Sequence, residues 1–173
     1  MIIKLICSLI IIISCTLLGI KYGENLRKRV EELNSLLQAV NQMKVHIQYT
    51  FTPIPEILND IAKKSSEPLA TIFNNISEKL FLNAVDSIHE AFIEELSKEN
   101  HELHLKNDDT EILLDLAKSL GDTDVEGQSN VLNLIDMKLK KQIKSAETEL
   151  EKNLKVYRYL GFSIGATIVI LII

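Results

Sequence analysis

The sequence predicts an all-α protein, a helical bundle of about six helices flanked by an N-terminal and a C-terminal transmembrane helix. Apolar residues recur at steps of three and four through the middle of the chain, which is the spacing of a helix face. Trp is absent and only three Pro and six Gly occur, which disfavours a sandwich or barrel of many short strands. Long apolar runs occupy the two ends. The expected division is therefore residues 2–20, 21–156 and 157–173.

The first apolar run, IIKLICSLIIIISCTLLGI, covers residues 2–20 and contains a single charge, Lys4. At 1.5 Å per residue a helix of this length spans about 28 Å, close to the roughly 30 Å hydrocarbon thickness of a bilayer. Lys4 stands near the end of the run, where its ammonium group can reach the lipid headgroups. The run therefore predicts a transmembrane helix.

A lipid anchor at Cys15 is the alternative for this end of the chain. The segment IISC, residues 12–15, resembles a bacterial lipobox, in which the cysteine becomes the lipidated first residue. The apolar run continues past Cys15 as TLLGI, where a solvated linker would be expected, and this favours the membrane span. A cleaved signal peptide is disfavoured because no small-x-small site follows the apolar core.

The second expected span is residues 157–173. Its last fourteen residues are nearly all apolar, and an aromatic and basic collar precedes them, formed by Tyr157, Arg158 and Tyr159. Within the span, Gly161 and Gly165 have the G-x-x-x-G spacing that lets two membrane helices approach closely. That spacing leaves a homo-oligomer open.

The distribution of basic residues predicts the topology. Lysines and arginines gather on the inner flanks of both spans, at positions 21, 27, 28, 29, 152, 155 and 158. The opposite side of the membrane is expected to receive only Lys4, near the outer end of the first span, and the α-amine. The positive-inside rule therefore places residues 21–156 in the cytoplasm, with both termini across the membrane.

The middle region divides into helices separated by polar or proline-containing segments. Apolar faces predict helices over residues 24–49, 54–61, 69–80, 85–96 and 112–120, and a long helix from about residue 128 into the second span. The charges of the first of these helices are expected on its exposed face. Four residues are expected to start or stop helices: Thr52, Ser66 and Asn107 or Asp108 as N-caps, and Gly121 as a left-handed stop.

No catalytic set is apparent, and we expect a non-enzymatic protein without a cofactor. Phosphate-binding glycine loops, the G-x-S-x-G nucleophile turn and the H-E-x-x-H zinc motif are all absent. Both cysteines, Cys7 and Cys15, lie in the first apolar run, so the middle region has no cysteine nucleophile or thiolate metal site. A net charge of −5 without a basic stripe excludes a nucleic-acid footprint. No catalytic, cofactor-binding or metal-binding residue is assigned.

Two weak metal patterns are interpreted as polar loops. His101 and His104 have i, i+3 spacing but no further ligands in sequence, so we interpret them as part of a solvated loop. The segment Asp122–Gly127, DTDVEG, matches the first half of an EF-hand loop, but the twelfth position is Asn133 rather than a bidentate glutamate. We interpret it as an acidic loop that caps the following helix.

Lys138, Lys141 and Lys144 lie near one another on the last helix. The simpler interpretation is a solvated face balanced by the glutamates that follow, Glu147, Glu149 and Glu151. The alternative is a docking surface for an acidic partner or for anionic lipid.

Several stretches together resemble the bacterial stage III sporulation protein AB family over essentially the whole chain. The matching stretches are the first span, YTFTPIPEILNDIA (49–62), EPLATIFNNISEKL (67–80), EILLDLAKSLGDTDVEGQ (111–128) and YRYLGFSIGATIVILII (157–173). The most specific element is LG-x-x-D-x-x-x-Q, carried by Leu120, Gly121, Asp124 and Gln128.

The resemblance implies a function that composition alone does not give. The family is similar to the GspF-like platform protein of type II secretion and type IV pilus systems, whose cytoplasmic domain is a helical bundle. It implies a scaffold in the mother-cell membrane around the forespore, within the secretion-like channel complex of endospore formation. The implied partners are the bacterial membrane, a secretion-type ATPase and other membrane proteins of that complex. The alternative function is an extracytoplasmic helical tether or interaction protein, anchored through lipidated Cys15.

Overall fold

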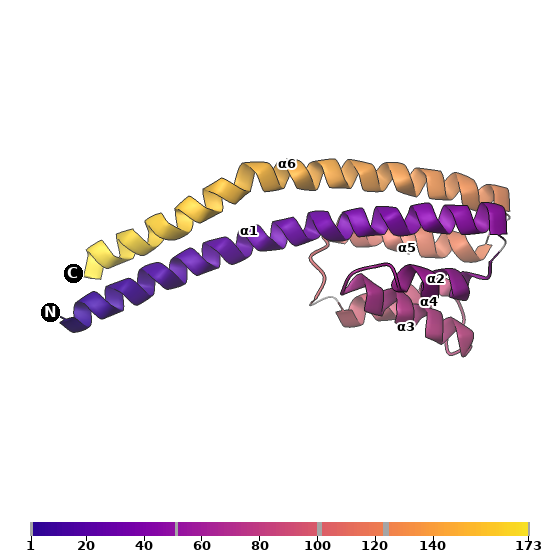
Figure 1. The fold of residues 1–173 in the computed structure, drawn as a ribbon, viewed down its shortest axis with the longest axis horizontal. Helices are drawn as coiled ribbons and strands as arrows, with labels where there is room; N and C mark the ends of the chain where they lie inside the picture. Colours follow the sequence, from indigo (N-terminus) through magenta and orange to yellow (C-terminus); the bar gives the residue numbers. More distant parts are fainter. Residues whose placement is uncertain (1, 51, 100–101, 123–124, 173) are drawn as a thin grey trace. The chain divides into compact units, whose positions relative to one another are not determined.

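The computed structural model describes residues 2–50, 52–99, 102–122 and 125–172, and for some of these the backbone alone. Backbone-only positions are 2–12, 15–16, 18–20, 22, 121–122, 125–126, 154–155, 157–162, 164–166 and 171–172. The described residues are helical and contain no strand, which confirms the all-α fold class. The elements are α1 (Ile2–Val45), a π-helical turn (His46–Thr50), α2 (Ile54–Ala62), α3 (Leu69–Phe81), α4 (Ile88–Lys98), α5 (Asn107–Asp122) and α6 (Val125–Ile172) (Figure 1).

The chain forms two compact units. The helical-bundle unit comprises Glu31–Lys144, and the terminal unit comprises the residues up to Val30 together with those from Ser145 onwards. Helices α1 and α6 each contribute residues to both units, because each is one uninterrupted helix. The first expected membrane span and the first bundle helix are therefore one element, and so are the last bundle helix and the second span.

Every helix contributes buried apolar side chains to the helical-bundle unit. Within it α3 packs against both α2 and α4, and α4 packs against α5. Phe73 of α3 and Phe92 of α4 meet edge to face, with ring centroids 6.4 Å apart. Full burial of each large apolar side chain contributes about 1.5–3 kcal/mol. The largest fully buried side chains are Phe73, Phe92, Leu33, Leu36, Met43, Ile57, Leu58, Ile61, Leu69, Ile72, Ile76 and Leu116.

The expected caps of α2 and α3 are wrong. The N-cap residues are Pro53 and Pro68, and neither helix has a side-chain cap from Thr52 or Ser66. Proline fits here because the first backbone N–H groups of a helix lack an intrahelical acceptor anyway.

The expected stop at Gly121 is also wrong. Helix α5 continues to Asp122, and no described glycine has a positive φ. Helix α6 begins at Val125, earlier than expected. The side chain of Gln128 reaches back across the connection, where its Nε2 donates to the Leu120 carbonyl at 3.1 Å. This bond satisfies one of the carbonyl groups that a helix end leaves without a partner.

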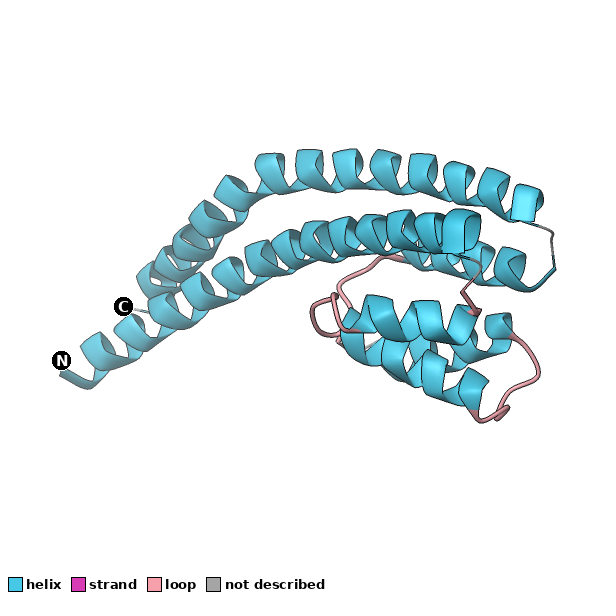
Figure 2. Ribbon diagram, turned by 45° about the vertical axis from the view of Figure 1, so that its right-hand side comes forward, coloured by secondary structure: helices cyan, strands magenta, loops and turns pink. Residues whose placement is uncertain are grey.

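In the terminal unit the two helical segments lie side by side and antiparallel, with both chain ends at the same end of the unit (Figures 1 and 2). Arg29 is buried, contrary to the expected exposed charges of this helix, and its Nη1 donates to Glu149 Oε2 at 3.0 Å. Among the residues that the structure describes, no helix combines the length and the apolar character needed to cross a membrane. The side chains of the expected Tyr157–Tyr159 collar are outside that description.

Candidate functional site

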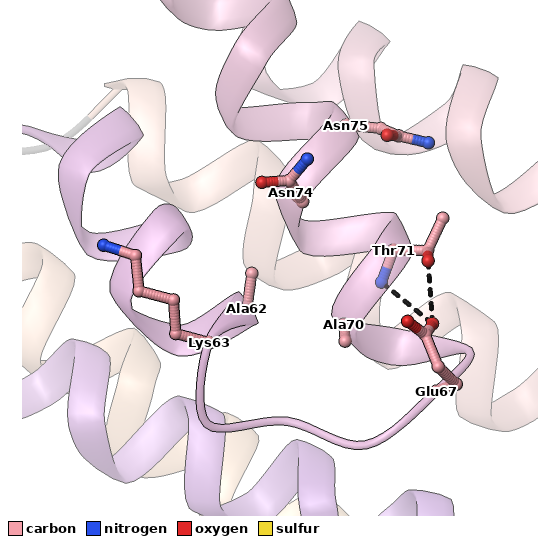
Figure 3. Close-up of a pocket in the computed structure, with 7 residues that line it drawn as sticks. All are labelled: Ala62, Lys63, Glu67, Ala70, Thr71, Asn74 and Asn75. Atoms are coloured by element: carbon pink, nitrogen blue, oxygen red, sulfur yellow. Dashed lines mark hydrogen bonds between the residues drawn. The ribbon is translucent and has the colours of Figure 1, made fainter.

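A hollow of about 300 Å³ opens between the end of α2 and the start of α3 (Figure 3). Two alanines leave room for it because their side chains end at Cβ. Glu67 stands at one end, where its Oε2 accepts from the backbone N of Thr71 at 3.2 Å and from the Thr71 hydroxyl at 2.7 Å. The lining residues are Ala62, Lys63, Glu67, Ala70, Thr71, Asn74 and Asn75.

A second hollow of about 290 Å³ lies between α3 and α4, and Asn75 lines both hollows. The remaining lining residues of the second hollow are Glu78, Lys79, Leu82, Ala84, Glu95, Lys98 and Glu99. We call the two hollows together the α3 groove. Five of the seven residues of the first hollow belong to the stretch EPLATIFNNISEKL.

The second hollow is organised by Glu95, a fully buried carboxylate on α4. Its Oε1 contacts Lys79 Nζ at 2.7 Å and Lys98 Nζ at 2.8 Å, and its Oε2 accepts from Asn75 Nδ2 at 3.0 Å. Burial alone would raise the pKa of Glu95, but hydrogen bonds from Lys79, Lys98 and Asn75 outweigh it and lower the pKa to about 2. The carboxylate therefore stays ionised at neutral pH.

Lys79 forms ion pairs with both the buried Glu95 and the exposed Glu94. Burial lowers the pKa of Lys79, but hydrogen bonds to Glu94 and Glu95 outweigh that effect and raise it above its ordinary value. A carboxylate and an ammonium group that are both locked in their charged forms cannot exchange protons near neutral pH. The groove offers fixed charges, two amides and the Thr71 hydroxyl for polar contacts, which suits binding of a protein segment.

Asn75 and Lys79 lie in the family-like stretch EPLATIFNNISEKL, but Glu95 lies outside every stretch that the sequence singles out, and no site residue is assigned among the three. The signal was a glutamate three residues after Phe92 and four after Ala91, within the apolar stripe of α4. Such a position predicts a buried charge with a partner. Of the partners found, Lys98 lies one turn along α4, whereas Lys79 and Asn75 lie on α3.

The sequence predicts that His101 and His104 are part of a solvated loop. For His104 this prediction is wrong, because its side chain and backbone both contact Glu32. His104 Nδ1 lies 2.7 Å from Oε1 of the buried Glu32, and the backbone N of His104 donates to Glu32 Oε2 at 2.8 Å. The pair anchors the loop before α5 to α1. His101 lies outside the described residues.

The segment Asp122–Gly127 does not form an EF-hand loop. Helix α6 already begins at Val125, so the later positions of a twelve-residue loop are helical, and Asn133 Oδ1 accepts from Lys44 Nζ at 2.5 Å instead. Asp124 and the side chains of Asp122 and Glu126 are outside the described residues. Across the described part of the chain, no group of three His, Cys, Asp or Glu side chains could hold a metal ion.

The counter-charge of Lys138 on α6 is not one of the glutamates expected to balance it. Lys138 pairs with Asp115 of α5 at 2.7 Å, and Lys140 pairs with Asp136 at 2.7 Å. Glu149, one of the expected counter-charges, instead accepts from Arg29. Lys141 and Lys144 are exposed on the same helix.

Comparison with known proteins places this chain. The sequence profile of the family described as stage III sporulation protein AB matches residues 4–173. The stage III sporulation protein AB of Bacillus subtilis (strain 168) is 27% identical over 169 residues, which cover 98% of each chain. A solved structure of stage III sporulation protein AB superposes with a TM-score of 0.66 at 27% identity, over 72% of this chain and 97% of that one. The all-helical fold, the full-length profile match and this structural likeness agree, and the chain belongs to the stage III sporulation protein AB family.

Proposed function

We propose that this sporulation protein is a non-enzymatic membrane platform in the channel complex between mother cell and forespore. Residues 2–20 and 157–173 anchor it in the mother-cell membrane, and the cytoplasmic bundle docks a secretion-type ATPase through the α3 groove. One observation carries the proposal: the two longest helices run from the bundle into the apolar ends without a break, and apolar side chains there face outward.

Those outward side chains support the anchors. Ile13 and Leu17 on α1, and Ile168 and Ile170 on α6, are all exposed, with Ile170 at 78%. In water, several exposed large aliphatic side chains close together favour aggregation, whereas lipid solvates them without cost. A helical backbone satisfies its own hydrogen bonds, as the hydrocarbon region requires.

We further propose that the platform passes motion of the bound ATPase to the membrane, and continuous helices suit this role. Helix α1 has 44 residues and α6 has 48, and each contributes to both units. A displacement of the bundle by a bound ATPase would reach the membrane along two stiff elements.

The α3 groove supports the docking function. It is lined largely by charged side chains, two amides and the Thr71 hydroxyl, and its central helix α3 is held in the core through Leu69, Phe73 and Ile76. A site on a packed helix presents its contacts without an ordering cost.

Topology is tested by cysteine labelling of the full-length protein in cells and inverted vesicles. In a background with Cys7→Ser and Cys15→Ser, the exposed Ser66→Cys should react with a membrane-impermeant maleimide in inverted vesicles only. A cysteine appended after Ile173 is the matched control and should react from the opposite face. Labelling of Ser66→Cys from outside intact cells would contradict the platform, and lipid labelling lost on Cys15→Ser would establish the tether.

Docking is tested by co-purification of the complex's ATPase from sporulating cells. Asn74→Arg places a long cation in the groove at a half-exposed position, so the helix should hold while ATPase recovery falls by about tenfold or more. Glu111→Arg, at an exposed position of α5, is the matched control and should leave recovery unchanged. Equal recovery with both variants would exclude the α3 groove as the docking site.

A further inference from the structure

A line of exposed residues on α6 combines apolar and basic side chains. Leu134 is 51% exposed and Met137 is 67% exposed, and Lys141 and Lys144 follow at exposed positions. Their spacing of three, four and three residues places them on one helix face. The opposite face carries the buried Leu132, Ile135 and Leu139. We call the exposed line the α6 strip.

A matching line with the opposite charge lies on α4. Ile93 is 45% exposed and stands between Glu90 and Glu94, with Ser97 one turn further on. These positions also share one face. Glu94 pairs with Lys79 and still keeps 46% of its side chain exposed. We call this line the α4 strip.

The regions around the two strips have complementary charge. Residues 66–99 contain seven carboxylates and two lysines, whereas residues 131–144 contain four lysines and one aspartate. Both strips belong to the helical-bundle unit, so each copy presents both. We propose that the α6 strip of one copy packs against the α4 strip of a second copy.

The proposed contact buries Met137 and Leu134 beside Ile93 and sets Lys141 and Lys144 against Glu90 and Glu94. Burial of the apolar side chains supplies affinity, and the opposite charges fix the register and favour this pairing over like-to-like contacts. Because each copy presents both strips, two copies that pair reciprocally form a two-fold dimer. Where the second strip of each copy engages a further copy, the same contact forms rings or rows.

The inference does not depend on ATPase docking or on topology, because its residues lie outside the α3 groove's first hollow and outside both anchors. The test uses two differently tagged full-length chains in the cysteine-free background, one with Met137→Cys and one with Ile93→Cys. They are co-reconstituted in phosphatidylcholine vesicles and mildly oxidised. We expect a disulfide between the two tags, reduced about tenfold when Lys141→Glu and Lys144→Glu are added.

Controls define the outcomes. A Ser66→Cys chain with the Met137→Cys chain measures random collision, and Lys64→Glu is the charge control away from both strips. Cross-linking no greater than the collision level, or mainly between identical tags, overturns the proposal. Protection of Met137→Cys from maleimide that requires anionic vesicles also overturns it, in favour of a lipid surface.

A second measurement avoids the cysteine substitutions. In a nonionic detergent, the mass of the wild-type chain from sedimentation should rise with protein concentration beyond that of a monomer. The Met137→Asp variant should stay a monomer with an unchanged circular dichroism spectrum. A variant with wild-type folding and wild-type association would refute the interface.

Discussion

At the scale of single residues, three buried charges in the described part of the chain have partners on other helices or in a distant loop. Arg29, Glu32 and Glu95 are all buried within helix stripes, and each contacts an oppositely charged or hydrogen-bonding partner. Such pairs add little net stability because desolvation offsets their attraction, but removal of one member leaves the other buried without compensation. Their main effect is therefore to specify which segments of the chain pack together.

Glu95→Gln should destabilise the protein and change its response to acid. The pKa of Glu95 is depressed to about 2, so its ionised form contributes stability that is complete above about pH 4.5 and is lost as pH falls towards 2. At pH 7 the substitution should lower the free energy of unfolding by on the order of 2–3 kcal/mol. Urea unfolding in nonionic detergent between pH 2 and 7 measures both effects.

The matched control is Glu94→Gln, because Glu94 contacts the same lysine from an exposed position. It should change the free energy of unfolding by less than about 1 kcal/mol. If Glu95→Gln and Glu94→Gln lower the free energy of unfolding equally at pH 7, burial does not set the strength of the Glu95–Lys79 ion pair.

Glu32→Ala should cost more stability than His104→Ala. The Glu32 carboxylate accepts from both the backbone and the ring of His104, whereas loss of the ring leaves the backbone bond intact. We expect about 1 kcal/mol for His104→Ala and roughly 2–3 kcal/mol for Glu32→Ala, from urea unfolding at pH 7. His89→Ala is the histidine control and should have little effect. The reverse order would show that the loop is not held through Glu32.

At the scale of elements, two helices begin at a proline without a side-chain cap, and two helix ends are satisfied by side chains. Prolines start α2 and α3, whereas Ser87 caps α4 by accepting from the backbone N of Glu90 at 3.1 Å. The connection between α5 and α6 is closed by a side chain from the next helix, the Gln128 amide. This hydrogen bond joins the first and last residues of the LG-x-x-D-x-x-x-Q element, Leu120 and Gln128.

Gln128→Ala should weaken the α5–α6 connection. The Leu120 carbonyl would lose its donor, with a loss of about 1 kcal/mol in the free energy of unfolding and faster amide exchange near the end of α5. Gln142→Ala, a half-buried glutamine on the same helix, is the control. Unchanged exchange in Gln128→Ala would mean that water replaces the amide without loss.

At the scale of the whole molecule, Arg29 and Glu149 join segments 120 residues apart in sequence. Arg29→Met keeps an unbranched apolar stem but removes the guanidinium group and its charge, so the free energy of unfolding of the terminal unit should fall by about 1–3 kcal/mol. A double-mutant cycle with Glu149→Gln should give a coupling free energy of at least 0.5 kcal/mol in urea unfolding. If the changes in the free energy of unfolding were strictly additive, the Arg29–Glu149 bond would contribute no coupling free energy.

The sequence alone determined the helical class, the bundle and the family, because helix periodicity and family motifs are local features that survive without coordinates. It also indicated that nothing interrupts the helix leading to the C-terminal run, since no proline or glycine lies within residues 129–160. Only the tertiary structure decided the partners of Glu95, Glu32 and Arg29, because each partner is brought close by packing of another turn or helix. The same holds for the α3 groove and the two strips: a helix face is visible in sequence, but which face stays open depends on what packs against it.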